Sequence, residues 1–170
     1  FLFKINSKSK EQYRGNKYTI FGGHELTIFT NSLGFKSQSS REVPLKSENR
    51  RILFIGDSFA EGVSLKYEDT FVGLIDSALK KKQIDVLNAA RSSYSAIVYW
   101  RKIKYLIEDV GLKFDEVIVY IDISDVQDEG FYDLSKDNIV INVKSDLQTI
   151  SQPQHSLAGV IKIFMSDNTT

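Results

Sequence analysis

The stretch from Ile52 to Gly62 constrains the fold more than any other, because an apolar run ends there abruptly at Gly-Asp-Ser. The run Ile52–Ile55 is short and continuously apolar, and two of its residues are β-branched, which is typical of a strand buried on both faces. A helical pattern begins a few residues later, so Gly56–Gly62 is predicted as the turn at the carboxyl end of that strand. Open α/β sheets bind their ligands at this end of their strands. We therefore expect Ser58 to lie in a ligand-binding crevice.

After this turn the chain alternates between helix and strand. Apolar residues from Phe71 to Leu79 recur at helical spacing, with Glu68 and Asp69 expected in the first turn and Lys80–Lys82 in the last, as the helix dipole favours. The later elements are predicted, in order, as a strand Ile84–Leu87, a helix over 96–110 closed by Gly111, and a strand Glu116–Ile121. With right-handed crossovers, this order gives a parallel sheet covered by helices on both faces, which is a three-layer α/β/α sandwich.

The first 50 residues are predicted as an extension with a β-hairpin. Residues 4–17 are polar and lysine-rich and are expected to form an exposed lead-in. The runs Lys17–Phe21 and Glu25–Phe29 are β-type and are separated by Gly22-Gly23-His24, which predicts the hairpin. Phe1–Phe3 fits a first strand, which we favour, or the tail of a membrane anchor upstream of Phe1. We accordingly divide the chain into an extension over 1–50, which ends in a loop, and an α/β domain over 51–170.

The composition excludes several classes of function. Twenty-two basic residues balance 22 acidic residues, so no field of one sign attracts a nucleic acid. The absence of cysteine excludes disulfides, thiolate metal sites and a cysteine nucleophile. The sequence contains no Gly-rich phosphate-binding loop, and its 170 residues suffice for one α/β core. We therefore expect no nucleic-acid partner. We also expect no cofactor and a small molecule or a carbohydrate as substrate, and we leave the oligomeric state open.

Three segments carry a resemblance to one family. Gly56–Gly62 resembles the first signature block of the GDSL/SGNH hydrolases, which are serine esterases and acyl transferases, with Phe59 in place of the family's leucine. Glu68–Phe71 opens the next helix as in many bacterial members. Asn31–Ser37 is similar to the Asn-x-x-Gly-Phe-Arg segment that precedes this block in membrane-linked relatives. The resemblance implies a flavodoxin-like SGNH hydrolase fold.

The resemblance also implies roles for residues of the first two loops. Ser58 would be the nucleophile, and its backbone N–H the first donor to the oxyanion. The second block usually reads Asn-x-Gly-x-x-Gly; Asn88 matches it, whereas Ala90 and Ser93 replace its glycines. Ser93 can still donate its backbone N–H if its backbone adopts the conformation of the glycine that it replaces. The alternative for Asp57 and Ser58 is that they only cap a turn.

The third loop departs further from the family pattern. The family's Gly-x-Asn-Asp corresponds to Asp122–Asp125, so Ser124 replaces the asparagine that acts as third oxyanion donor, and Asp125 keeps its place. A hydroxyl has one proton to donate where an amide has two, and turn chemistry at a strand end is an equally good account of this loop. The loop continues to Asp128 and Glu129, and the acidic cluster fits a divalent cation or, as we favour, a solvated loop. We expect Asp57, Asn88 and Asp125 to support the site and no metal to occupy it.

The general base is the part of the family pattern that the sequence does not supply. The family's last block, Asp-x-x-His, has one candidate in His155, but Gln152 stands where the family has aspartate, and the other histidine, His24, precedes the nucleophile. Residues Phe131–Thr149 show no convincing crossover helix, so we expect the catalytic Asp and His to lie beyond Thr170. Ser156–Met165 is predicted as the helix of a cap or lid.

The resemblance implies ester hydrolysis or acyl transfer, often of acetyl groups on a carbohydrate, through an acyl-Ser58 intermediate. It also implies a bacterial extracytoplasmic or membrane-associated location. The substituted donors and the missing Asp-x-x-His favour an alternative of another class, a catalytically inactive binding or scaffolding module with the same fold. A third possibility is an unrelated flavodoxin-like domain in which Asp57 and Ser58 contact a small ligand without chemistry.

Overall fold

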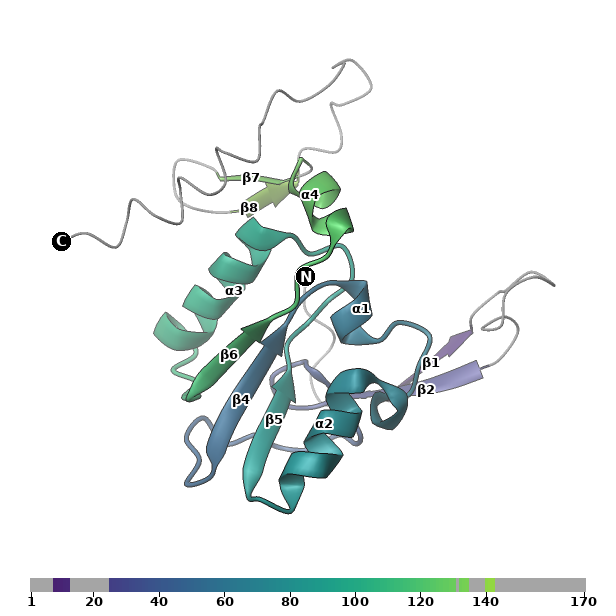
Figure 1. Ribbon diagram of the computed structural model, residues 1–170, viewed down its shortest axis with the longest axis vertical. Helices are drawn as coiled ribbons and strands as arrows, with labels where there is room; N and C mark the ends of the chain where they lie inside the picture. The colour runs from purple at the N-terminus through teal and green to yellow at the C-terminus, as the bar shows by residue number, and fades with distance from the viewer. Residues whose placement is uncertain (1–7, 13–24, 131, 135–139, 143–170) are drawn as a thin grey trace.

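The computed structural model describes residues 8–12, 25–130, 132–134 and 140–142, and its main element is a six-stranded mixed sheet with strand order β1-β2-β3-β5-β4-β6 (Figure 1). A separate antiparallel pair joins β7 to β8. The strands are β1 Lys8–Gln12, β2 Glu25–Thr30, β3 Lys36–Ser37, β4 Arg50–Ile55, β5 Ile84–Asn88, β6 Glu116–Val119, β7 Tyr132–Leu134 and β8 Val140–Asn142. The helices are α1 Ser58–Glu61, η1 Tyr67–Asp69, α2 Phe71–Lys80, α3 Ala96–Glu108 and α4 Ile123–Glu129, where η1 is a 3₁₀ turn.

The centre of the sheet is the parallel trio β5-β4-β6, as the sequence predicts. Phe54, near the end of β4, lies opposite Asn88 of β5 and Ile118 of β6. The three strands therefore end at one edge of the sheet, which confirms the predicted α/β class. Strand β6 ends at Val119 rather than at the predicted Ile121.

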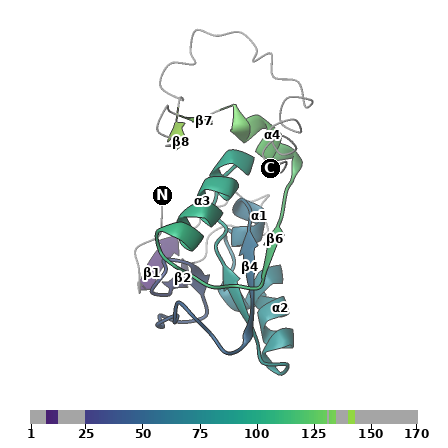
Figure 2. The same cartoon turned by 90° about the vertical axis from the view of Figure 1, so that its left-hand side faces the viewer.

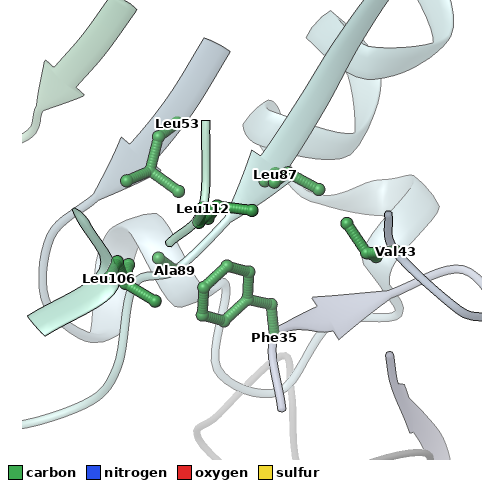
Figure 3. Packing of buried hydrophobic residues seen from close by; sticks show 7 residues of the cluster. All are labelled: Phe35, Val43, Leu53, Leu87, Ala89, Leu106 and Leu112. Carbon is green, nitrogen blue, oxygen red and sulfur yellow. The ribbon is translucent and has the colours of Figure 1, made fainter. Parts of the chain in front are cut away.

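Alternate residues of β4 face the two helical layers. Ile52 and Phe54 pack with Val72 of α2, whereas Leu53 belongs to a buried cluster on the other face that includes Leu106 of α3. Figure 3 shows the second cluster, which consists of Phe35, Val43, Leu53, Leu87, Ala89, Leu106 and Leu112. Helices α2 and α3 accordingly lie on opposite sides of the sheet (Figures 1 and 2). The layers are those of the predicted α/β/α sandwich.

The N-terminal strands make the sheet mixed rather than purely parallel. β2 pairs antiparallel with both β1 and β3, and β3 joins the parallel trio through the pair Lys36 and Asn88. Residues 8–12, expected to be part of a polar lead-in, are the strand that pairs with β2, whereas Lys17–Phe21, the predicted partner, lies outside the described residues. The division of the chain at residues 50 and 51 stays a prediction.

Helix α2 begins later than its acidic residues predict. Thr70 caps it, because the Thr70 hydroxyl oxygen accepts a hydrogen bond from Gly73 N at 3.0 Å. Glu68 and Asp69 lie in the separate turn η1, so the prediction that they occupy the first turn of this helix is wrong. Helix α3 is followed by Gly111 at φ +75°, the left-handed conformation that ends many helices. Among the described residues, no helix is long and apolar enough to span a bilayer.

Candidate active site

Ser58 is the first residue of the four-residue helix α1, directly after the central strand β4. The Asp57 side chain caps this helix by accepting a hydrogen bond from Phe59 N at 2.9 Å, and Asp57 is 2% exposed, whereas Ser58 is half-buried. The predicted turn over 56–62 is thus a strand end followed at once by a short helix. This places the Ser58 hydroxyl at the carboxyl edge of the sheet.

The turn Gly56–Gly62, which carries Ser58, requires glycine at its start. A Cβ on Gly56 would lie 2.7 Å from Ala60 Cβ and 3.0 Å from the carbonyl oxygen of Tyr120. The first atom belongs to α1 and the second to the chain that leaves β6, where Tyr120 N donates to Ile55 O at 2.8 Å. Only glycine lets the turn, the helix and the end of β6 approach this closely.

The loop after β5 is hydrogen-bonded to the turn that carries Ser58. Asn88 is buried, donates from Nδ2 to Ala60 O at 2.8 Å and accepts at Oδ1 from Ala90 N at 3.1 Å. Arg91 N donates to Gly56 O at 3.0 Å. The predicted supporting residue Asn88 therefore connects the second loop to α1, and the first two loops form one hydrogen-bonded unit.

Ser93 has a left-handed backbone conformation. Its φ is +62°, in the left-handed region that residues other than glycine rarely occupy. Its carbonyl oxygen accepts a hydrogen bond from the Tyr132 hydroxyl at 2.6 Å, and the N–H of the preceding Ser92 is held by Glu61 of α1. The loop after β5 is therefore held on both sides of Ser93, which occupies a conformation that glycine adopts more readily.

The third loop contains the start of helix α4. This helix was not predicted from the sequence. The Asp122 side chain accepts hydrogen bonds from Ser124 N, at 2.6 Å, and from the backbone N–H of Asp125. Asp125 Oδ2 in turn accepts from Asp122 N at 3.0 Å, and this reciprocal pair between Asp122 and Asp125 is a capping box. The spacing Asp122-x-x-Asp125 was the signal for this helix. Asp125 also accepts a 2.6 Å hydrogen bond from the Tyr99 hydroxyl of α3, and burial raises the pKa of the Asp125 carboxyl.

The Ser124 hydroxyl is directed at carboxylates. Its Oγ lies 2.6 Å from Asp122 Oδ1 and 3.2 Å from Asp57 Oδ2, and this hydrogen bonding from Ser124 holds the pKa of Asp122 below its usual range. A serine hydroxyl has a single proton to donate. In this arrangement the hydroxyl donates its proton in a hydrogen bond to a carboxylate, and Ser124 Oγ lies between the third loop and the turn that carries Ser58.

Three carboxylates of the site lie close together. Asp57, Asp122 and Asp125 each place one oxygen within 4.8 Å of the others. The predicted members Asp128 and Glu129 are not part of this group, and Glu129 instead accepts from Ile97 N of α3 at 3.2 Å. Because the three carboxylates cap two helices and accept the hydrogen bonds described above, these contacts account for their proximity.

Two buried lysines donate hydrogen bonds to backbone carbonyls of the site. Neither was predicted from the sequence as a site residue. Lys36 donates to Gly62 O and Leu65 O, at 2.7 Å each, and so fixes the end of α1. Lys102 of α3 donates to Ala89 O at 2.7 Å. Lys36 lies in the segment Asn31–Ser37 that carries part of the family resemblance, and Lys102 occupies a helical position otherwise typical of core residues. The sequence thus places both lysines in segments expected to contact the core, but it does not show that their side chains are buried.

The remaining predicted residues lie outside the described part of the chain. They are His24, Gln152, His155 and the predicted lid helix Ser156–Met165. Since the sequence has only two histidines, the described residues contain none.

Comparison with known proteins gives partial structural neighbours. No protein-family model and no curated protein matches the chain. Among solved structures, AlinE4, described as an SGNH-hydrolase family esterase, is 23% identical, with a TM-score of 0.42 over 50% of this chain and 46% of AlinE4. Two AlinE4 variants give TM-scores of 0.41 at 24% and 23% identity, each covering 48% of this chain and 44% of the variant. The chain thus spans less than half of these proteins, and a similarity of this extent carries no argument about activity. The neighbours belong to the family that the sequence motifs resemble.

Proposed function

We propose that the protein is a serine ester hydrolase or acyl transferase that works through an acyl-Ser58 intermediate. One observation carries the proposal: Ser58 lies half-buried at the carboxyl end of the central parallel strand, and the loops after β5 and β6 are both fastened to its turn. Nucleophilic catalysis needs a hydroxyl held in one place with donors fixed around it. Fastened loops of this kind supply such rigidity.

In the proposed reaction the Ser58 oxygen attacks the acyl carbonyl carbon while a general base takes the hydroxyl proton. The carbonyl oxygen becomes an oxyanion, the alcohol leaves with a proton from the base, and water or another hydroxyl then releases the acyl group. The backbone N–H groups of Ser58 and Ser93 are the proposed oxyanion donors. Ser58 N–H is in the first helical turn, where no intrahelical carbonyl is available to it. Ser93 has a left-handed φ of +62°, a conformation that glycine adopts more readily than other residues.

We assign Ser124 to support of the carboxylates Asp57 and Asp122 rather than to the oxyanion, because its hydroxyl already donates a hydrogen bond to a carboxylate. Removal of an oxyanion donor typically lowers turnover by roughly 10²–10³-fold. Ser124→Ala therefore separates the two roles. The general base in this proposal is a histidine outside the described residues, and the substrate is an acyl ester, with an acetylated carbohydrate proposed from the resemblance of Asn31–Ser37.

The proposal is tested by the hydrolysis of p-nitrophenyl acetate and of acetylated oligosaccharides by the full-length protein. Ser58→Ala should abolish turnover, whereas Ser77→Ala, at an exposed position of α2, should leave it unchanged. Turnover that survives Ser58→Ala would refute the role of Ser58.

The second candidate is a binding module without catalysis, which the engaged Ser124 hydroxyl favours. It predicts that acetylated oligosaccharides bind to the full-length protein, as measured by calorimetry, without any release of acetate.

A further inference from the structure

Lys102 is a charged side chain inside the layer between the sheet and α3. It is 9% exposed, its Nζ donates to Ala89 O at 2.7 Å, and it lies 4.8 Å from the ring centre of Tyr94 and 5.3 Å from that of Phe35. A buried ammonium is costly unless it is hydrogen-bonded, and aromatic faces attract it. The Lys102 ammonium therefore carries a desolvation penalty that its packing alone does not explain.

The carbonyl that Lys102 holds begins the loop that carries Ser93. Ala89 is fully buried and its own N–H donates to Phe54 O at 2.8 Å, so it is the last point at which the loop is tied to the sheet. On the opposite side, Arg91 N is bound to Gly56 O at 3.0 Å. The loop after β5 is thus held at two points: by Lys102 of α3 at Ala89, and by Gly56 at Arg91.

The charge on Lys102 changes in the neutral pH range. Burial lowers its pKa from the usual 10.5 to about 7; the positive charge of Arg91 lowers it further, and the negative charge of Glu61 opposes both. Burial raises the pKa of the neighbouring Tyr94 to about 12, so that this phenol keeps its proton when Lys102 titrates. Phe35, from the segment before β3, contributes no titratable group. A neutral amine makes a weaker hydrogen bond to Ala89 O and loses its attraction to both rings.

We propose that Lys102 is a positioning residue for the acyl-transfer reaction: its charged form holds the Ala89 carbonyl and thereby the Ser93 N–H, and loss of its proton loosens this half of the oxyanion site. The inference rests on the proposed function. A displaced donor costs roughly 10- to 100-fold in turnover, so kcat should fall by that factor as the pH rises through 7 while KM changes little.

The kinetic experiment compares kcat and KM between pH 5 and 9 for the full-length wild type, Lys102→Met, Lys102→Arg and Lys104→Met. Lys104 is on the same helix, and its side chain is 38% exposed, which makes it the matched control. We expect the fall in kcat to disappear in Lys102→Met, which should be uniformly slow, to move to higher pH in Lys102→Arg, and to persist in Lys104→Met. The same fall in Lys102→Met would overturn the proposal.

A second measurement does not depend on catalysis or on the folding of a variant. In the wild-type protein, the ¹³Cε resonance of Lys102 and the amide resonances of Ala90 and Ser93 are followed by NMR over the same pH range. All three should change with a common midpoint near pH 7, and amide resonances that do not follow Lys102 would overturn the proposal even if the protein is an active esterase. If the resonances change together but no ester is hydrolysed, the positioning device stands and the proposed function fails.

Discussion

Replacement of Gly56 by alanine tests the close packing of the turn Gly56–Gly62 against α1 and the chain after β6. The new Cβ would lie 2.7 Å from Ala60 Cβ, 3.0 Å from Tyr120 O and 3.1 Å from Tyr120 Cβ. None of these atoms is the free end of a flexible side chain, so relief requires a shift of α1 or of the chain after β6. Overpacking of this kind costs about 1–3 kcal/mol, and we expect a loss of about 2–3 kcal/mol from the free energy of unfolding.

Urea denaturation of the wild type and Gly56→Ala measures this cost, with Gly130→Ala as the control. A Cβ on Gly130 meets only Gln127 O at 3.4 Å, and the control should stay within about 0.5 kcal/mol of the wild type. In the double variant with Ala60→Gly, the closest contact disappears, and we expect a favourable coupling of about 1 kcal/mol between the two positions. A Gly56→Ala protein as stable as the wild type would refute the packing described for this turn.

Three further changes probe the site. Lys36→Met removes both hydrogen bonds to Gly62 O and Leu65 O and should lower the free energy of unfolding by about 2–3 kcal/mol in urea titrations. Burial lowers the pKa of Lys102 from 10.5 to about 7, so between these pH values the folded chain binds fewer protons than the unfolded chain. The free energy of unfolding of the wild type should therefore rise from pH 7 to pH 10.5, by up to about 5 kcal/mol relative to Lys102→Met. Parallel stability curves for the two proteins would contradict this. Ser124→Ala should lower kcat by less than about tenfold, since a loss of roughly 10²–10³-fold is typical of a true oxyanion donor.

The parallel core of the fold was predictable because its signals are local. The run Ile52–Ile55 is apolar at every position since β4 is covered on both faces, and the sequence shows this without knowledge of the partners. The predicted strand over 84–87 and helix over 96–110 each agree with the structure to within two residues. Ser58 was identified as a site candidate because it follows the predicted strand, whereas Asn88 and Asp125 were identified from the resemblance to the family's second and third blocks.

The parts that were not predicted depend on distant contacts or on short elements. Helices α1 and α4 have four and seven residues, which is too short to show a helical spacing of apolar residues. Their capping residues, Asp57 and Asp122, are the signals that indicate them in the sequence. β1 consists of the polar residues Lys8–Gln12, which lack the apolar pattern of a strand, and only the pairing with β2 shows that they form one. Lys102 stands in a helix rich in charged residues, and only the tertiary structure shows that it is buried.

The most direct test of the central claim is to treat the full-length protein with a serine-directed phosphonate and to locate the adduct by peptide mass spectrometry. We predict one adduct, on Ser58, which is absent from Ser58→Ala and present in Ser77→Ala. The absence of an adduct on Ser58, under conditions that label a control esterase, would contradict the assignment of Ser58 as an activated nucleophile and leave the binding module as the account of this fold.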